Sequence, residues 1–161
     1  MNIIEHFVNG KKFLGNSKRT SKVFNPATGE QSAEVKLAST LDMEVAVAAA
    51  KNAFSSWSKK PPLQRARVMF KFKEIIEKNF EELTKIIVSE HGKVFDDAKG
   101  EITRGLEVVE FACGIPQLLK GEFTENVGKD VDSWSLRQPL GVCAGITPFN
   151  FPAMVPMWMF P

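Results

Sequence analysis

The end of the chain carries the feature that most constrains the fold, an apolar run that stops abruptly at a proline-rich turn. Residues 140–146 contain no charged side chain, and a run that is apolar on both faces predicts a strand buried within a sheet. The run stops at Thr147-Pro148, because proline lacks the N–H that a strand donates and restricts the residue before it. Such a strand is typical of an α/β protein.

Asn150 is the one strongly polar side chain in the segment that follows, between Pro148 and Pro152. In α/β enzymes, groups of the active site lie where a buried strand ends in a turn, so Asn150 is a candidate site residue. The alternative is that Asn150 only satisfies backbone groups of the turn, which is a common role of asparagine. Composition and spacing leave both roles open.

Composition excludes several classes of partner. The 161 residues suffice for one domain, and 21 Lys and Arg against 19 Asp and Glu give no reason to expect nucleic acid or an anionic membrane. Cys113 and Cys143 lie in apolar stretches without metal-ligand spacing, so we expect two buried thiols, no metal site and a reducing compartment. No uncharged run reaches the ~18 residues of a membrane span, and no targeting signal is recognisable, so we expect a soluble cytoplasmic protein.

The chain ends in an apolar run, residues 154–161, that stops at a proline. A natural C-terminus is usually polar, solvated or frayed. We therefore expect a truncated chain whose last residues pack on parts that the sequence does not contain.

The first third of the sequence is typical of scaffold. Asn9-Gly10 between two short extended arms predicts a hairpin, because both residues tolerate the positive φ of a type I′ turn. Residues 25–29 predict a second turn, and residues 32–37 alternate as a strand does.

Helices are predicted next. Ser39 with Asp42 forms a capping box before a helix, and Pro61-Pro62 starts another whose apolar face extends to residue 87. Asn79 is expected to cap a new helix within that span, and Gly92 to end it. The apolar stripe of the first helix consists of Val47, Ala50, Phe54 and Trp57, which indicates core packing.

Arg104 is the informative residue of the last long helix, which begins near Asp96 and Asp97. One interpretation is an exposed pair with Glu101 or Glu107 at helical spacing, worth only a few tenths of a kcal/mol. The other is a clamp for a substrate carboxylate, since a guanidinium binds carboxylates through two parallel hydrogen bonds. Spacing does not decide between them.

Four stretches of the sequence resemble the aldehyde dehydrogenase superfamily. Residues 146–152, Ile-Thr-Pro-Phe-Asn-Phe-Pro, resemble its Pro-aromatic-Asn-Phe-Pro motif. The flanking residues 138–145 and 154–161, and the helical residues 100–112, are similar to one branch, the CoA-acylating methylmalonate-semialdehyde (malonate-semialdehyde) dehydrogenases. The resemblance covers the whole chain but only the front third of a normal family member.

The resemblance implies a role for each motif. Asn150 would be the catalytic amide that donates to the substrate carbonyl oxygen and stabilises the oxyanion formed when a thiolate attacks the aldehyde. Arg104 would bind the acid group of the semialdehyde. The backbone expected against the nicotinamide half of NAD belongs to Ile146, Thr147, Pro148 and Phe149.

The resemblance also implies a domain organisation. Residues 1–132 would be the N-terminal hairpins and helices of a Rossmann-like NAD-binding domain, and residues 133–140 an oligomerisation or bridging strand. Residues 141–161 would supply its first buried strand, the motif turn and the start of the next helix. From polarity alone, residues 122–132 are a surface connection; the resemblance implies a projecting hairpin there and a homo-oligomer, dimer or tetramer.

The catalytic domain of the family is missing from the sequence. Neither cysteine suits the role of nucleophile, since burial suppresses the thiolate, and no Gly-x-Gly-x-x-Gly occurs. The resemblance implies a parent enzyme that oxidises malonate or methylmalonate semialdehyde with NAD and coenzyme A to acetyl-CoA or propionyl-CoA. The alternatives are a non-acylating dehydrogenase of another acid-bearing aldehyde, and a non-catalytic interaction fragment.

Overall fold

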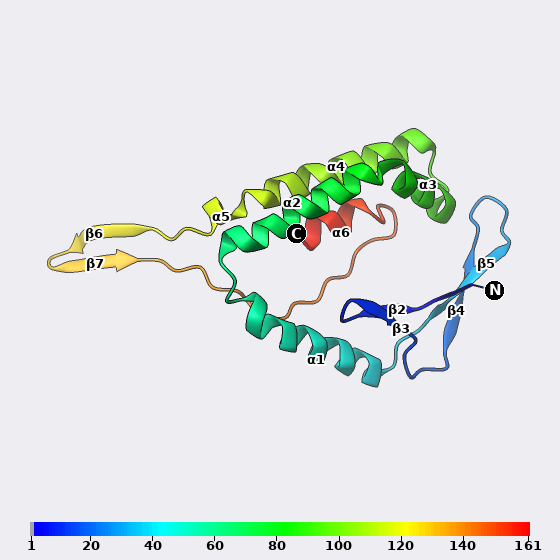
Figure 1. The fold of residues 1–161 in the computed structure, drawn as a ribbon, viewed down its shortest axis with the longest axis horizontal. Coiled ribbons are helices and arrows are strands. Elements are labelled where there is room, and N and C mark those ends of the chain that lie inside the picture. The colour runs from blue at the N-terminus through cyan, green and yellow to red at the C-terminus, as the bar shows by residue number, and fades with distance from the viewer. Residues whose placement is uncertain (1) are drawn as a thin grey trace.

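The structure, a computed structural model, describes residues 2–161; Met1, the first residue of the expected unit 1–132, lies outside the described part. It is a mixed α/β arrangement (Figure 1). The strands are β1 (Asn2–Ile4), β2 (His6–Val8), β3 (Lys11–Phe13), β4 (Thr20–Phe24), β5 (Gln31–Lys36), β6 (Phe123–Gly128) and β7 (Val131–Trp134). The helices are α1 (Thr40–Trp57), α2 (Pro62–Lys78), α3 (Phe80–His91), α4 (Phe95–Cys113), α5 (Ile115–Leu118) and α6 (Met154–Met159).

The predicted N-terminal hairpin and strand are confirmed. β2 and β3 pair antiparallel around Asn9 (φ 53°) and Gly10 (φ 76°), the positive φ values that Asn-Gly was expected to supply. The predicted strand near residues 32–37 is β5, which pairs parallel with β1 and antiparallel with β4.

The capping box of α1 is also confirmed, and it has a second function. The Ser39 side chain accepts from the backbone N–H of Asp42, and the Asp42 carboxylate accepts from the backbone N–H of Ser39 at 2.8 Å. The same carboxylate accepts from the backbone and side-chain N–H groups of Asn16, at 2.7 and 2.9 Å. The hydrogen bonds from Ser39 and Asn16 hold the pKa of Asp42 well below its ordinary value. The start of α1 is therefore tied to the loop after β3.

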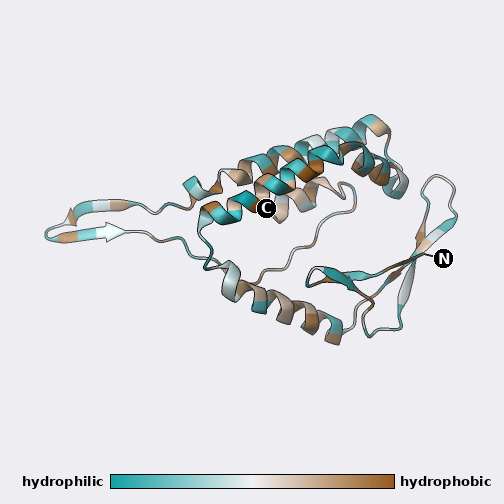
Figure 2. Ribbon diagram, in the orientation of Figure 1, coloured by the Kyte–Doolittle hydropathy of each residue, from teal (hydrophilic) through white to brown (hydrophobic). Residues whose placement is uncertain are grey.

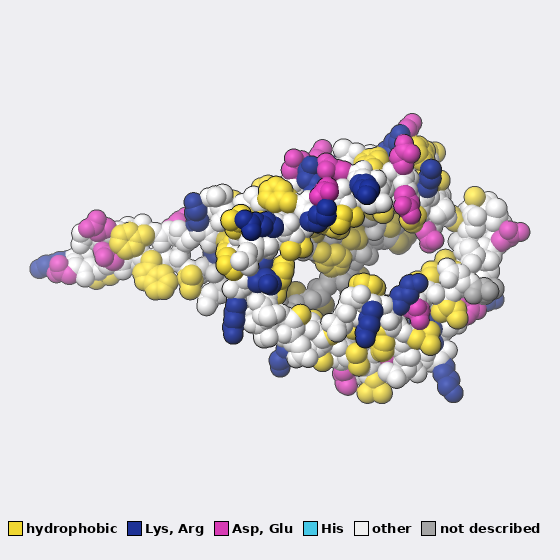
Figure 3. Space-filling view, viewed as in Figure 1, with side chains coloured by type: hydrophobic (Ala, Val, Ile, Leu, Met, Phe, Trp, Pro, Cys, Tyr) yellow, Lys and Arg dark blue, Asp and Glu magenta, His cyan; other side chains and the backbone are white. Residues whose placement is uncertain are grey.

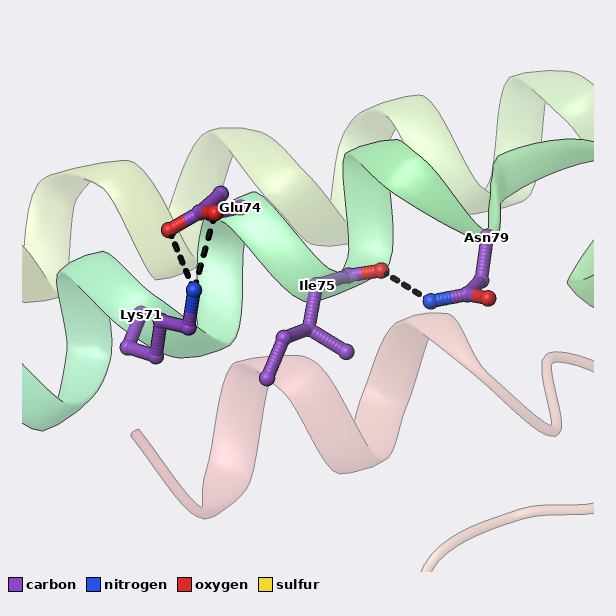
Figure 4. A network of polar contacts seen from close by, with 4 residues as sticks. All are labelled: Lys71, Glu74, Ile75 and Asn79. Carbon is purple, nitrogen blue, oxygen red and sulfur yellow. Dashed lines mark hydrogen bonds and ion pairs between the residues drawn. The ribbon is translucent and has the colours of Figure 1, made fainter.

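The boundary between α2 and α3 lies where it was predicted, but the predicted role of Asn79 is wrong. Asn79 makes no N-cap hydrogen bond for α3; its side-chain amide donates back to the carbonyl oxygen of Ile75, at 2.7 Å (Figure 4). Asn79 thus satisfies a carbonyl at the end of α2. At the other end of α3, Gly92 has φ 80° and terminates the helix as predicted.

The core lies where α4 meets α2, α3 and α6 (Figure 1). Its buried apolar side chains are Ile76, Ile87, Ala98, Ile102, Val109 and Met157. A Cβ on Gly105 of α4 would collide with the side chain of Met157, so a glycine at this position lets α6 lie directly against α4. This contact matters because α6 follows the turn that carries Asn150.

The predicted buried strand at residues 140–146 is not formed. Residues 141–148 belong to no helix or strand, and the side chains of Leu140 and Ile146 are each 95% exposed. A strand needs a hydrogen-bonded neighbour, and within residues 2–161 no sheet contains this segment. The apolar sequence is therefore irregular and unpaired in the described chain.

Two further surfaces differ from the expectations drawn from residue pattern. The predicted apolar stripe of α1 is not covered, since Val47 and Trp57 are exposed. Hydrophobic residues occur along α1 as they do along the other long helices (Figure 2). Residues 122–132 are exposed, as their polarity predicted, but they are not an irregular connection: most of them form β6 and part of β7, a hairpin that projects from the molecule as the resemblance implied (Figure 1). Hydrophobic side chains cover parts of this hairpin and surround the opening beside α1 (Figure 3). Along residues 2–161, no helix combines the length and hydropathy that crossing a membrane requires.

These exposed surfaces predict that the isolated 161-residue chain associates. Large contiguous apolar surface is normally covered, so we expect light scattering to show oligomers or aggregates and denaturant unfolding to lack a sharp transition. Lysine at both Leu140 and Ile146 should reduce this association, whereas Lys71→Ala on exposed α2 should not. A monodisperse monomer with a sharp, reversible transition would contradict the prediction.

Candidate functional site

The polar centre of the helical layer is Glu101, whose side chain is completely buried in α4. One carboxylate oxygen, Oε2, lies 2.6 Å from Nζ of Lys93. The other, Oε1, accepts from the backbone N–H groups of Ala153 at 2.7 Å and Met154 at 3.1 Å. Burial alone raises the pKa of Glu101, but the hydrogen bonds from Lys93 and the two amides outweigh it and keep the pKa below its ordinary value.

Glu101 stands in for a missing helix cap. Ala153 is the N-cap residue of α6 and Met154 its first residue, and no side chain caps this helix locally, since Phe151, Pro152 and Ala153 carry no side-chain oxygen. The acceptor is supplied instead by α4, more than 50 residues earlier in the chain. The buried carboxylate therefore joins the helix that carries Arg104 to the turn that carries Asn150.

Phe151 reinforces this junction. Nζ of Lys93 lies 4.0 Å from the centroid of the Phe151 ring, and the guanidinium carbon of Arg104 lies 5.9 Å from it. Both are distances at which a cation is attracted to an aromatic face. Trp158 of α6 adds a hydrogen bond from Nε1 to the backbone carbonyl oxygen of Arg104, at 3.2 Å.

Arg104 is exposed, and the pairing with Glu101 or Glu107 considered from sequence does not occur. Glu101 is bound to Lys93 and to backbone amides instead. Among the described residues, the Arg104 guanidinium forms an ion pair with no carboxylate. The substrate-clamp role of Arg104 stays a prediction.

Asn150 lies in the turn directly before Phe151, with its side chain exposed. The four residues predicted to contact NAD precede it outside any helix or strand, and Phe149 already belongs to the turn; Ile146, Pro148 and Phe149 are exposed and Thr147 is half-buried. Both candidate residues, Arg104 and Asn150, therefore border the Phe151 ring or its backbone. The roles of Asn150 and of residues 146–149 also stay predictions.

Sequence reasoning missed Glu101, treating it only as a neighbour of Arg104. A signal was present: Glu101 lies within the apolar stripe of α4, three residues after Ala98 and four before Gly105, where a surface glutamate is out of place. A charged residue in a buried stripe needs a partner, and the sequence does not say that Lys93 and the amides of Ala153 and Met154 provide it.

The two cysteines differ. Cys113 is buried, and burial raises the pKa of its thiol, as predicted. Cys143 is exposed, so its predicted burial is wrong, because the strand expected to enclose it is unpaired. Within residues 2–161, no three His, Cys, Asp or Glu side chains gather where they could hold a metal ion.

Comparisons of the sequence and of the structure with known proteins point to the same family. Residues 13–161 match the model of the aldehyde dehydrogenase family. Over 161 residues the chain is 49% identical to a malonate-semialdehyde dehydrogenase of Pseudomonas aeruginosa, covering all of this chain and 32% of the relative. Over 159 residues it is 47% identical to malonate-semialdehyde dehydrogenase 1 of Geobacillus kaustophilus, covering 99% of this chain and 33% of the relative.

Solved structures agree. A methylmalonate-semialdehyde dehydrogenase of Oceanimonas doudoroffii matches with a TM-score of 0.95 and 55% identity, over 99% of this chain and 33% of that one. A Sinorhizobium meliloti protein assigned to the same activity and crystallised with NAD matches with a TM-score of 0.95 and 53% identity, with the same coverage. The chain thus spans about a third of the length of the relatives it matches.

The two thiols provide a direct test of the local structure. In dilute native protein, we expect a disulfide reagent to modify Cys143 at least about a hundredfold faster than Cys113, because reaction needs an accessible thiolate. Cys143→Ser should remove the fast phase, and Cys113→Ser the phase that appears only on unfolding. Equal rates for both thiols under native conditions would show that α4 is not packed as described.

Proposed function

The chain belongs to the aldehyde dehydrogenase family, and we propose that it is the N-terminal part of an NAD-dependent, CoA-acylating dehydrogenase of malonate or methylmalonate semialdehyde. The observation that carries the proposal is that Arg104, exposed and free of carboxylate partners in residues 2–161, lies against the ring of Phe151, the residue directly after Asn150. An acid-bearing aldehyde needs a cation for its carboxylate and a hydrogen-bond donor for its carbonyl oxygen. Relatives named for malonate and methylmalonate semialdehyde support the substrate class.

The proposed reaction changes the substrate in three ways: the aldehyde is oxidised, the β-carboxylate is lost, and the acyl group is transferred to coenzyme A. A cysteine thiolate outside this chain attacks the aldehyde carbon, the adduct is oxidised to a thioester, and the β-carboxylate leaves as carbon dioxide or bicarbonate. Coenzyme A then takes up the acyl group, giving acetyl-CoA or propionyl-CoA and regenerating the thiol. NAD, when bound, supplies the hydride acceptor for the oxidation.

The residues of this chain support three parts of that reaction. The Asn150 amide donates to the oxygen that becomes negatively charged when the thiolate attacks, and Arg104 holds the carboxylate through paired hydrogen bonds. We propose that the nicotinamide half of NAD lies against residues 146–149, because these residues are outside the helices and strands and mostly exposed, which leaves their peptide groups open to a flat ring. Arg104 and Asn150 thereby orient the two ends of one short substrate.

We also propose that the full enzyme is a cytoplasmic homo-oligomer, a dimer or tetramer. The β6–β7 hairpin supports this, because Phe123 and Trp134 lie opposite each other and are 66% and 69% exposed. The same exposed surfaces favour a second candidate for the 161 residues alone, a non-catalytic fragment that joins a larger assembly. Both candidates predict no activity for the 161 residues alone, and turnover by a full-length enzyme that contains these residues supports the first.

The chain alone should produce no NADH from malonate semialdehyde. The covalent step needs an activated thiol, and Cys113 has a raised pKa while Cys143 has no base or cation beside it in the described residues. The measurement is NADH absorbance with NAD, coenzyme A and semialdehyde, against a sample without protein. NADH formation above that background would refute the prediction.

A full-length enzyme for mutational tests is obtained by joining residues 1–161 to the remaining two thirds of the Pseudomonas aeruginosa relative, in place of its matching N-terminal third. This chimaera supplies the missing thiol and covers the exposed apolar surfaces. It is the protein used in the experiments that follow.

Arg104→Leu should distinguish a substrate clamp from a structural arginine. In the chimaera, we expect kcat/KM for malonate semialdehyde to fall sharply, because a charged hydrogen-bonded pair is lost. The corresponding loss of transition-state stabilisation is roughly 2 to 4 kcal/mol. Propanal, which has no carboxylate, should be affected little. Arg67→Leu, at an exposed position of α2, is the matched control. Equal losses for both aldehydes would mean that Arg104 is structural.

Asn150→Ala should reduce the single-turnover acylation rate by about a hundredfold or more, as removal of an oxyanion donor does. NAD affinity should change little, because backbone of residues 146–149 makes the proposed cofactor contacts. Asn150→Asp should be at least as damaging, since a carboxylate repels the developing charge. Asn52→Ala on α1 is the control.

If Asn150 serves only the turn, another pattern results. Aspartate suits such turns as well as asparagine does, so Asn150→Asp would keep its rate and any change would appear in Tm. A stable Asn150→Asp enzyme with near-normal acylation would remove Asn150 from the reaction.

A further inference from the structure

We propose that Glu101 is a positioning residue for the oxyanion donor: its buried carboxylate fastens the turn containing Asn150 to α4, at a fixed distance from Arg104. This inference rests on the proposed function of Asn150. It assigns a role to Glu101, the one fully buried carboxylate among residues 2–161, whose oxygens are bound to Lys93 and to the amides of Ala153 and Met154.

The fastening point is close to the residue that it positions. Oε1 of Glu101 binds the amides of Ala153 and Met154, and Ala153 is three residues after Asn150. Three residues span at most about 10 Å, and Pro152 fixes one of the intervening φ angles near −65°. Holding the amide of Ala153 therefore restricts where the Asn150 backbone can lie.

The same carboxylate is placed relative to Arg104. Glu101 and Arg104 are three residues apart in one α-helix, so their positions are related by a rigid turn of backbone. Two further contacts hold α6 and the turn against α4 near Arg104. Trp158 donates a hydrogen bond to the Arg104 carbonyl oxygen, and the Phe151 ring lies beside the Arg104 guanidinium. A 1 Å displacement of a reacting group can cost about a hundredfold in rate, so such fastening matters to catalysis.

Lys93 connects the Glu101 carboxylate to the ring of Phe151. Its ammonium group pairs with Oε2 of Glu101 and lies over the ring of Phe151, the residue next to Asn150. Glu101→Gln keeps the volume of the side chain but removes its charge and places an amide donor or a weaker acceptor before Lys93. We expect this variant to release both the lysine and the α6 amides.

The experiment uses the chimaera with Glu101→Gln, and Glu107→Gln as the matched control on the exposed side of α4. Hydrogen exchange followed by mass spectrometry should show the amides of Ala153 and Met154 exchanging at least about tenfold faster in Glu101→Gln only. Single-turnover acylation should fall at least about tenfold, with NAD affinity unchanged. Ile102→Val, a buried loss on the same helix, controls for a general decrease in stability.

A double-mutant cycle shows whether Glu101 acts through Asn150. If it does, Glu101→Gln should slow acylation in the enzyme with Asn150 but cause no further loss in Asn150→Ala. The same fold loss in both backgrounds, or unchanged exchange at residues 153 and 154, would overturn the proposal. If Asn150→Ala itself leaves acylation unchanged, the proposed function of Asn150 fails and so does the catalytic part of this inference. The exchange data would then still show whether Glu101 holds the turn.

Discussion

The arrangement of the candidate site depends on one buried carboxylate that accepts two backbone hydrogen bonds from a helix without a cap of its own. Glu101 contributes a charge that is costly to bury, and Lys93 together with the amides of Ala153 and Met154 compensates it. The cost of burying this charge is offset only if Lys93 and the two amides all stay in place, so the positions of these groups relative to Glu101 are narrowly defined. It joins residues more than 50 positions apart, and the relation between α4 and the motif turn follows from it.

Around this unit the structure is well packed on one side and open on the other. Gly105 lets Met157 press against α4, and Ile76 and Ile87 close the core from α2 and α3. Towards α1 and along residues 140–146, many apolar side chains are exposed, and no strand among residues 2–161 pairs with residues 140–146. The chain spans about a third of its relatives' length, and we propose that the remaining two thirds supply the strands beside residues 140–146 and the reactive thiol.

The sequence predicted features whose cause is local. Asn9-Gly10 and Gly92 accept positive φ, and Ser39 finds its capping partner three residues on, so these structures follow from neighbouring residues. Residues 140–146 failed as a strand because strand formation depends on a distant partner, which pattern does not reveal. Glu101 was missed for the same reason: its partners at residues 153 and 154 are close only after folding. The family resemblance identified Arg104 and Asn150, whose chemical roles geometry alone does not assign.

Activity of the unmodified chimaera tests the central claim most directly, that residues 1–161 contain the substrate-orienting part of an acid-semialdehyde dehydrogenase. The measurement is kcat/KM for malonate semialdehyde and for propanal, with NAD and coenzyme A, in a chimaera shown to be folded. We expect turnover with a preference for malonate semialdehyde of at least about tenfold, because Arg104 binds the carboxylate. A folded chimaera that binds NAD but turns over neither aldehyde, or that shows no preference between them, would contradict it.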